Sequence, residues 1–341
     1  MKNRTIFPIL IAFLAVFMLP QTSPAPIVWN PDTGWQTEGK VPILDTPQDQ
    51  IEAGKKCEEK KDWENALNNY RVTIRLWPQS PYSPQARFGE ARMLEQLGLF
   101  DKAFVSYQKL IEKNPNDERF GEILKHQYEI ANRFLAGERV KVWRIKTVPS
   151  MDKAVELYEQ VIKNGPYSEV APMAQLKIGE AKDKGKLYEE AVLAYQKVID
   201  NYSKSPFVAE AYYHIGNSYY KQSSRADYDQ SAAQRAALAY QDFLSRYPKH
   251  EKIKEVEATI TRLQTEQAAG LWKVAQYYDR TLGDPTAALI YYNDLIGKFP
   301  TSSYAQKAKP RLEQIKRQLA GTPAAKPKET KKTEPKDEKK K

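Results

Sequence analysis

Residues 235–248 read RAALAYQDFLSRYP and contain the pattern that decides the fold. Ala236 and Tyr240 are four residues apart, so both lie on one face of a helix, where the small side chain admits a neighbouring helix and the ring fills the space beside it. Pro248 follows the tyrosine by eight residues, where the helix must end. The stretch therefore predicts a helix that packs closely on another helix and then stops.

The same pattern recurs along the chain. An Ala followed four residues later by a Tyr marks six copies, at Ala66/Tyr70, Ala103/Tyr107, Ala154/Tyr158, Ala191/Tyr195, Ala236/Tyr240 and Ala288/Tyr292. A Pro stands eight residues after the Tyr in five copies, and Ser203 takes its place in the fourth. The steps between tyrosines are 37, 51, 37, 45 and 52 residues, so a basal period near 37 with three enlarged copies indicates a repeat array.

A second amphipathic helix precedes each copy and carries a small residue where the two helices cross. These small residues are Gly54, Ala91, Ala131, Gly179, Gly216 and Ala275. The order of a small residue, Ala-x-x-x-aromatic and Pro is the pattern of the tetratricopeptide repeat. The sequence therefore predicts an all-α tetratricopeptide-repeat superhelix, or solenoid, of about six helix pairs with a C-terminal closing helix over 302–319.

The enlarged copies place insertions. Residues 139–150 (RVKVWRIKTVPS) predict a short β-like or looped segment within the third copy, and residues 223–230 lengthen the turn of the fifth. In the sixth copy the first helix is predicted to be long, from about residue 251 to residue 280.

The two ends of the chain differ from the repeats. Lys2 and Arg4 precede an apolar stretch of about 14 residues, which is typical of an export signal over 1–25 and is shorter than the ~20 residues that span a bilayer. Residues 26–47 form a Pro-rich extended segment, in which Trp29 and Trp35 either pack onto the first helices or form a partner-binding peptide. The repeat domain covers 48–320, and the Lys-rich tail 321–341 is predicted to be disordered.

Composition argues against catalysis and bound groups. One cysteine, Cys57, excludes an internal disulfide framework and any Cys-based metal site, and the three histidines are widely scattered. No Walker-type loop, G-x-G-x-x-G or G-x-S-x-G motif is present. Of the net charge of +10, the tail supplies +4, so the charge does not indicate a nucleic-acid-binding face. The sequence predicts a protein that is not an enzyme and has no cofactor, metal or nucleic-acid partner.

A solenoid of helix pairs offers a groove lined by the first helix of each pair. Side chains three before, one after and four after the small crossing residue are expected to face this groove and to bind partner segments. From this register we select Phe88, Arg92, Tyr128, Asn132, Tyr213, Asn217, Tyr220, Trp272, Gln276 and Asp279. The alternative for each ring is ordinary packing between repeats.

Two stretches resemble one branch of the repeat family. They are RAALAYQDFLSRYPKHEKIKEVEATITRLQ (235–264) and LWKVAQYYDRTLGDPTAALIYYNDLIGKFPTSSYAQKA (271–308), with a long linking helix and a VAQYY entry to the final pair. They are similar to the outer-membrane-protein assembly factor BamD (YfiO-type) family, and the similarity covers about 50–310. The family is typically a lipoprotein, whereas no lipobox cysteine follows the apolar stretch here.

The resemblance implies a non-catalytic periplasmic scaffold of the outer-membrane β-barrel assembly machinery, at the inner face of the outer membrane. Its partners would be the barrel-forming subunit and unfolded outer-membrane proteins. Peripheral membrane association would use an uncleaved N-terminal segment, the basic tail on anionic lipid, or docking alone. The alternative is a periplasmic tetratricopeptide-repeat adaptor that coordinates cell-envelope division or another envelope complex.

Overall fold

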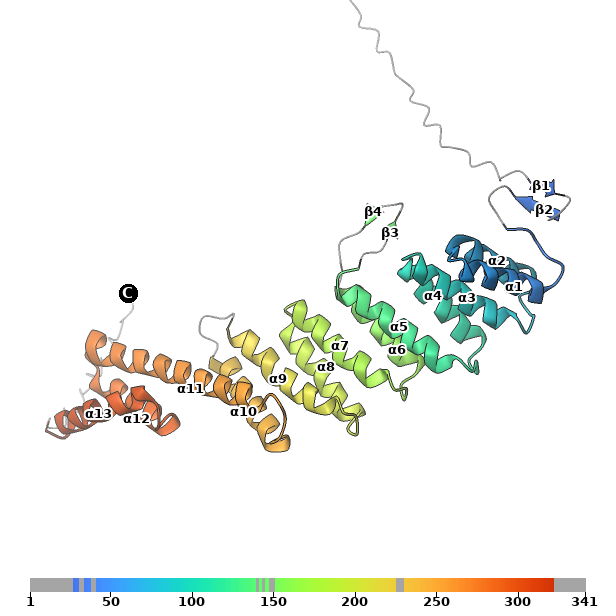
Figure 1. The fold of residues 1–341 in the computed structure, drawn as a ribbon. Helices are drawn as coiled ribbons and strands as arrows, with labels where there is room; N and C mark the ends of the chain where they lie inside the picture. The colour runs from blue at the N-terminus through green and yellow to red at the C-terminus, as the bar shows by residue number, and fades with distance from the viewer. Residues whose placement is uncertain are drawn as a thin grey trace, which may run out of the picture. The chain divides into compact units, whose positions relative to one another are not determined.

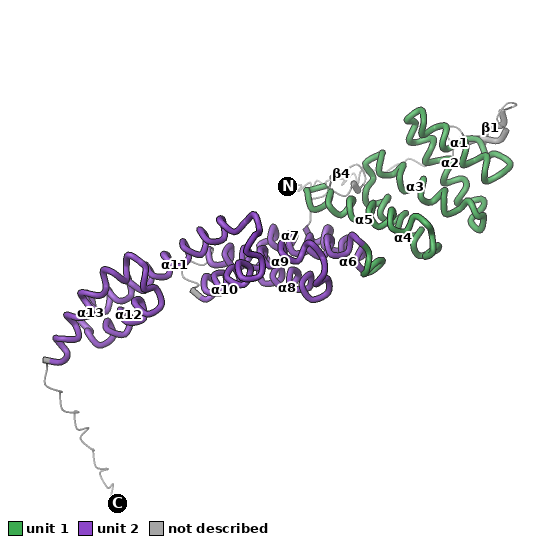
Figure 2. Tube along the Cα trace, turned by 60° about the horizontal axis from the view of Figure 1, so that its bottom comes forward, with its two compact units in different colours: residues 1–150, 163–168 green, residues 151–162, 169–341 purple. Residues whose placement is uncertain are grey.

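The computed structural model describes residues 41–138, 151–224 and 230–321, and the backbone of four short strands at 27–30, 34–37, 141–142 and 145–146. Expectations for the signal 1–25 and for the tail from 322 onward lie outside the described residues. The chain divides into two compact units, which are residues 1–150 with 163–168 (unit 1) and residues 151–162 with 169–341 (unit 2), as Figure 2 shows.

Helices account for nearly all of the described chain (Figure 1). In chain order they are α1 (Pro47–Glu59), α2 (Trp63–Leu76), α3 (Ser83–Gln96), α4 (Phe100–Lys113), α5 (Phe120–Leu135), α6 (Met151–Asn164), α7 (Ala171–Lys184), α8 (Tyr188–Asn201), α9 (Val208–Ser223), α10 (Gln230–Arg246), α11 (Ile253–Gln276), the π-helical turn η1 (Tyr277–Leu282), α12 (Pro285–Lys298) and α13 (Ser303–Gly321). Four strands form two antiparallel hairpins, β1 (Ile27–Asn30) with β2 (Gly34–Thr37), and β3 (Lys141–Val142) with β4 (Ile145–Lys146).

The helices follow the predicted repeat register. The small crossing residues lie on α1, α3, α5, α7, α9 and α11, and the Ala/Tyr pairs lie on α2, α4, α6, α8, α10 and α12. Each of the six alanines is fully buried, and each of the six tyrosines is at most 3% exposed. Helix α13 then closes the array. The predicted all-α repeat fold, with six helix pairs and a closing helix among the described residues, is confirmed.

Tyrosine rings lie directly against the small residues of the preceding helix. A Cβ atom built on Gly179 would be 2.3 Å from Cε1 of Tyr195, and one on Gly216 would be 2.5 Å from Cδ1 of Tyr240. Real Cβ atoms do not approach other atoms so closely, so glycine is required at these two crossings. The rings thus fill the space that the missing side chains leave, at close to the density of a protein interior.

Replacing Gly179 by alanine is expected to destabilise unit 2 by about 1–3 kcal/mol, because the new methyl group overlaps the buried ring of Tyr195. Gly297 on α12 is the matched control, since nothing lies within 4 Å of its hypothetical Cβ. There the same substitution should be neutral or stabilising by up to ~1 kcal/mol through helix propensity. Urea unfolding of both variants measures the difference, and equal midpoints would contradict the close packing.

Helix α11 connects two separate hydrophobic clusters of unit 2. Its first half contributes Val256, Ile260 and Leu263 to a cluster with α9 and α10, and its second half packs with α12 and α13. Residues 264–266, between the two halves, are exposed. The long first helix predicted for the sixth copy is therefore one continuous helix that serves two cores and continues into η1.

The residues between η1 and α12 explain why the chain turns at this point. Gly283 has a positive φ of 66°, which suits glycine, and Asp284 accepts a hydrogen bond from the backbone N–H of Ala287 at 3.0 Å. Pro285 occupies the first turn of α12.

Two short hairpins add to the sequence prediction. Strands β1 and β2 lie within the segment 26–47 expected to be extended, and they pair Trp29 with Trp35 across the register. Ile27, Val28 and Trp29 favour a strand because β-branched and aromatic residues suit a pleated backbone. Strands β3 and β4 lie within the 139–150 insertion, where a β-like segment is expected. The tryptophan side chains, and most of the insertion at 223–230, lie outside the described residues.

Candidate protein-binding surface

In several pairs, a carboxylate on the first helix accepts a hydrogen bond from the hydroxyl of the repeat tyrosine. Tyr107 donates to Glu95 at 2.6 Å, Tyr195 is 3.5 Å from Asp183, and Tyr70 donates to Glu58. In each case the carboxylate stands four residues after the small crossing residue. Burial, followed by the neighbouring carboxylate, raises the pKa of Tyr195. This register position therefore serves the interior of the helix pair.

Phe88 and Arg92 of unit 1 differ in accessibility. Phe88 is 9% exposed and is covered by the Arg119 guanidinium at 5.0 Å, by His126 and by Tyr107, whose ring centroids are each 5.9 Å away. Arg92 is 45% exposed and lies 3.6 Å from the carboxylate of Glu58. Phe88 is thus largely packing between repeats, whereas Arg92 presents its charge to solvent.

The two other residues selected in unit 1 lie on α5. Tyr128 is 7% exposed, and Asn132 is half-buried with its amide 3.5 Å from Glu129. The polar residue is therefore again the more accessible of the two.

Unit 1 holds the segment before α1 through a side-chain amide. Gln50 is fully buried on α1, and its Oε1 accepts a hydrogen bond from the Leu44 N–H at 2.9 Å. Its Nε2 donates to the carbonyl of Pro42 at 3.1 Å and to Asn69 at 2.6 Å. Val41 at the start of this segment is 9% exposed. The first repeat therefore holds the backbone of 42–44 by hydrogen bonds from one side-chain amide.

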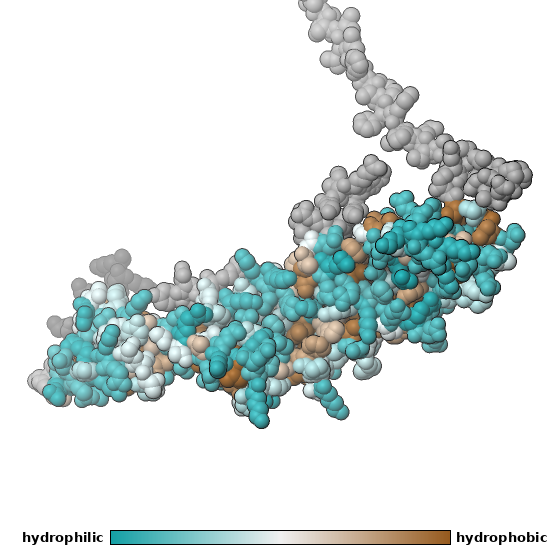
Figure 3. All heavy atoms as spheres, viewed as in Figure 1, coloured by the Kyte–Doolittle hydropathy of each residue, from teal (hydrophilic) through white to brown (hydrophobic). Residues whose placement is uncertain are grey.

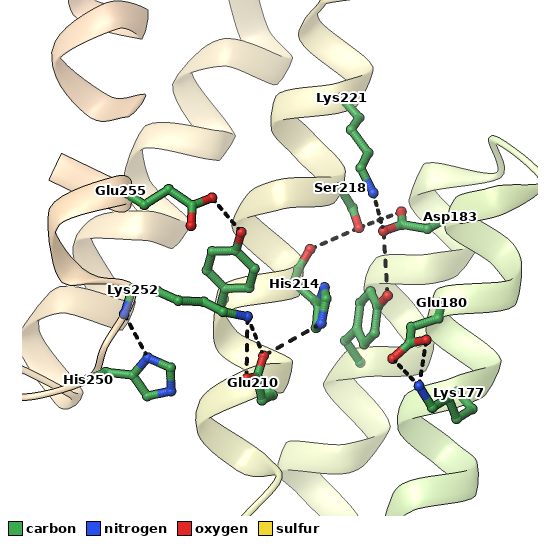
Figure 4. A network of polar contacts seen from close by, with 12 residues as sticks. Lys177, Glu180, Asp183, Glu210, His214, Ser218, Lys221, His250, Lys252 and Glu255 are labelled. Atoms are coloured by element: carbon green, nitrogen blue, oxygen red, sulfur yellow. Dashed lines mark hydrogen bonds and ion pairs between the residues drawn. The ribbon is translucent and has the colours of Figure 1, made fainter. Parts of the chain in front are cut away.

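In unit 2 the predicted tyrosines of α9 are contacted by α11 and by Lys252, the residue that precedes it. Tyr213 donates to Glu255 at 2.8 Å, and the Lys252 ammonium lies 4.0 Å from its ring centroid. The Arg262 guanidinium is 4.8 Å from the ring of Tyr220. Figure 4 shows Lys252 and Glu255 on the element facing α9. Both rings thus have intramolecular partners, and sequence counting did not identify these three charged residues.

Asp183 is the centre of the polar contacts between α7 and α9 (Figure 4). Its side chain is 5% exposed and accepts hydrogen bonds from Ser218 at 2.8 Å and from Lys221 at 2.9 Å, in addition to Tyr195. A buried charge is tolerated when it is paired and hydrogen-bonded. The cluster therefore fixes the register of the two first helices.

His214 on α9 lies between the Asp183 cluster and the contacts that Lys252 and α11 make with α9. Its ring stacks on Tyr195 with centroids 5.0 Å apart, and Nε2 is 3.6 Å from Glu210, which also pairs with Lys252 at 3.0 Å. The buried Nδ1 has no hydrogen bond with any residue in the described part of the chain. Burial lowers the pKa of His214 below its ordinary value, against the opposing effect of Glu210.

Unit 2 is therefore expected to lose stability as the pH falls below about 6.5, the pKa of an unfolded histidine. The folded state resists protonation of His214, so the stability is fully present above that pH and declines toward the lower pKa of the folded state. The facing charges are Glu180, Asp183, Glu210 and Lys252. Melting temperatures between pH 7.5 and 5.0 should fall more steeply in the wild type than in His214→Gln. Parallel slopes would contradict this role.

The last pair contains the remaining selected residues. Trp272 is half-buried, with its ring 5.6 Å from Tyr292 and 6.4 Å from Tyr304, and Gln276 is half-exposed one turn later. These ring contacts place most of Trp272 in the packing of the last pair.

Asp279 is internal. Its side chain is 3% exposed and is bound by two Arg311 nitrogens at 2.7 and 2.8 Å and by the Tyr292 hydroxyl at 3.2 Å. The hydrogen bonds from Arg311 hold the pKa of the Asp279 carboxyl below its usual range. Burial, with the neighbouring carboxylate, raises the pKa of Tyr292 to about 12. Asp279 therefore acts inside the protein, and Asn217, which is half-buried on α9, and Gln276 are the more accessible polar groups of unit 2.

The described residues contain no group of three or more His, Cys, Asp or Glu side chains able to hold a metal ion. Cys57 is a free, half-buried thiol whose pKa is raised by burial and by Asp62. Among the helices of the described ranges, none combines the length and the apolar character needed to cross a membrane.

Comparisons with known proteins match separate parts of the chain. Residues 147–293 match the family described as YfiO, outer membrane lipoprotein, and residues 59–118 match a tetratricopeptide-repeat family. The outer membrane protein assembly factor BamD of Caulobacter vibrioides is 27% identical over 161 residues, covering 47% of this chain and 52% of that protein. BamD of Rickettsia prowazekii is 24% identical over 160 residues, covering 47% and 63%. The chain thus matches between half and two thirds of the length of these relatives.

Similar solved structures include a MamA protein, with 17% identity, a TM-score of 0.36 and coverage of 61% of this chain and 94% of that one. The type IV pilus biogenesis factor PilW shows 14% identity, a TM-score of 0.29 and coverage of 78% and 100%. The sequence matches confirm the resemblance to BamD-type (YfiO) tetratricopeptide-repeat proteins.

Proposed function

We propose that this BamD-like chain is a non-catalytic periplasmic scaffold of the machinery that assembles outer-membrane β-barrel proteins. The observation that carries the proposal is the position of the YfiO match, because residues 147–293 run from just before α6 to within α12 and so include the polar contacts of α7, α9 and α11. The scaffold lies at the inner face of the outer membrane and binds the barrel-forming subunit and unfolded outer-membrane proteins.

The two units take different partners in this proposal. Unit 1 holds extended segments of unfolded outer-membrane proteins near Arg92 and Asn132, with Phe88 and Tyr128 as the apolar floor. The Gln50 amide, which already pairs with the backbone of 42–44, supports this mode because backbone pairing tolerates varied side chains. Unit 2 docks the barrel-forming subunit through the α9 and α11 face, where Asn217 and Gln276 lie.

A pull-down from envelope extract with the full chain tests the proposal. Recovery of a large outer-membrane β-barrel subunit is the expected result. Recovery of division or peptidoglycan-linked proteins without that subunit would overturn the proposal and identify an envelope adaptor instead.

The double variant Asn217→Arg, Gln276→Arg is expected to weaken binding of the barrel-forming subunit by about 1–3 kcal/mol. Both positions are half-buried on the first helices of their pairs, α9 and α11. In the proposed docking mode, the added bulk and charge obstruct the partner. The control is Gln241→Arg, which adds the same side chain at an exposed position of α10. Calorimetric titration measures the affinities, and melting temperatures check folding. Equal affinity of the double variant and the control would exclude this face.

A further inference from the structure

Two second helices of unit 2 each expose a leucine at the same position of the repeat. Leu193 on α8 is 64% exposed and Leu238 on α10 is 58% exposed, and each stands two residues after the buried alanine of its Ala/Tyr pair. Figure 3 shows hydrophobic atoms at the surface over the α8 and α10 part of unit 2, between hydrophilic ones. Two steps along a helix turn a side chain by about 200°, so both leucines point away from the core that buries the alanines. The same position of α6 is the exposed Glu156, so the repeat fold does not require a leucine there.

Contacts at both ends of α8 and α10 place these leucines on neighbouring, similarly directed helices. At the N-terminal ends, Arg235 of α10 pairs with Glu189 of α8 at 2.8 Å. At the other end of α10, the Arg246 guanidinium lies 4.9 Å from the ring of Tyr212, near the start of α9, the helix that follows α8. Between the ends, Ala239 packs against the hydrophobic cluster of α7, α8 and α9. Residues three or four apart share a helix face, so the leucines lie about one turn beyond the Arg235–Glu189 pair on the same side of the two helices.

Charged residues surround the two leucines in an alternating order. On α8, Glu189 stands four residues before the leucine and Lys197 four residues after it, and both are exposed. On α10 the order is reversed, with Arg235 three residues before the leucine and Asp242 four residues after it. Asp242 pairs with Arg246 of its own helix at 2.8 Å, and Lys197 makes no ion pair with any residue of the described chain. These charges lie at the surface, where ion pairs exchange partners at small cost.

A second copy of the chain presents the matching charges to this surface. A two-fold axis perpendicular to the helices sets α8 antiparallel to α8 of the second copy, and α10 antiparallel to α10. The leucines then meet their own counterparts at the centre. Glu189 of each copy lies opposite Lys197 of the other, and Arg235 lies opposite Asp242. The surface is therefore complementary to itself, with an apolar centre and a charged rim.

We infer that α8 and α10 form a self-association face, which pairs in this antiparallel manner with the same face of a second copy of the chain. A bilayer is a poorer match, because lipid-binding surfaces surround their apolar groups with cations, whereas this rim has two charges of each sign. The face lies on second helices, and the proposed docking of the barrel-forming subunit uses the first helices α9 and α11. The inference therefore goes beyond the proposed function and does not depend on it.

Sedimentation equilibrium of the full chain over a range of concentrations tests the inference. A reversible equilibrium between monomer and dimer is expected for the wild type. Leu193→Asp with Leu238→Asp should raise the dissociation constant of the dimer roughly tenfold or more, because it places carboxylates in the apolar centre. The control is Val105→Asp with Ile290→Asp, which makes the same change at two exposed aliphatic residues of the same register on α4 and α12 and should leave the constant unchanged. Melting temperatures check the folding of both variants.

A charge-exchange experiment tests the antiparallel pairing. Lys197→Glu alone and Glu189→Lys alone each place like charges opposite one another across the axis, so each should weaken self-association about fivefold. An equimolar mixture of the two variants restores opposite charges at both positions and should dimerise about as tightly as the wild type. Pairing of α8 with α10 of the second copy would leave like charges in the mixture and give no recovery.

Three results would overturn the inference. They are a wild type that stays monomeric, equal dissociation constants for the leucine variant and its control, and a mixture that associates no more tightly than its components. The first of these would favour a different protein as the occupant of this face. The leucine variant should still recover the barrel-forming subunit in the pull-down, so that experiment reports on the proposed function independently.

Discussion

Replacement of Tyr195 by alanine is expected to destabilise unit 2 by about 3–5 kcal/mol, the cost of removing a large buried aromatic ring. The ring is 0% exposed, lies against Gly179 and stacks on His214. Loss of the ring opens a cavity beside α7. Gly179 has no side chain that could fill this cavity. Urea unfolding should show an early transition, and the melting temperature should fall.

Two controls define what the ring contributes. Tyr195→Phe keeps the ring and loses only the hydroxyl, which is 3.5 Å from Asp183, so a cost below about 1 kcal/mol is expected. Tyr167→Ala removes a tyrosine that is 99% exposed and should be near neutral. If Tyr195→Ala cost no more than Tyr167→Ala, the repeat tyrosines would not hold the helix pairs together.

Replacement of Arg311 by alanine is expected to cost roughly 2–4 kcal/mol, because it leaves the buried Asp279 carboxylate without its cation. The Asp279 side chain is 3% exposed, and two Arg311 nitrogens bind both of its oxygens. The same pair joins η1 to α13, so the closing helix should be the first element to lose protection. Hydrogen exchange of α13 amides in the variant measures this effect directly.

The Arg311 prediction has a distinct pH signature. Arg311 depresses the pKa of Asp279 in the folded state, so its contribution is present above about pH 3.9, the value for an unfolded aspartate, and is lost as the pH falls toward the folded value. Arg311→Ala and wild type should therefore approach each other in stability in acid. Arg317→Ala, an exposed change on the same helix, is the control. If Arg317→Ala and Arg311→Ala destabilised the protein equally, the buried Asp279–Arg311 pair would not be what holds α13 in place.

The helices could be predicted from the sequence because their signal is local and repeated. Ala and Tyr four residues apart recur in each pair, and burial of all six pairs follows from the same packing of a ring beside a small residue. The long α11 was also predictable, since no Pro or Gly interrupts 253–269. Strands β1 and β2 were missed because the prolines around them outweighed a few β-branched and aromatic residues.

The groove residues were less predictable because accessibility depends on which helix covers them. Counting along α9 places Tyr213 on the face expected to line a groove, but it does not reveal that Lys252, just before α11, and Glu255 of α11 contact it. For Asp279 a signal was present, because acidic residues also stand four positions after the small residue at Glu58, Glu95 and Asp183. That recurrence indicates an internal partner for the repeat tyrosine.

Hydrogen exchange of the full chain, alone and with the purified barrel-forming subunit, tests the central proposal that unit 2 docks this subunit. Protection is expected in 208–223 and 253–276, with residues 47–113 unchanged. An unfolded outer-membrane protein should protect residues within 47–135 instead. Protection of 47–113 by the barrel-forming subunit, with α9 and α11 unaffected, would contradict the assignment of partners to the two units.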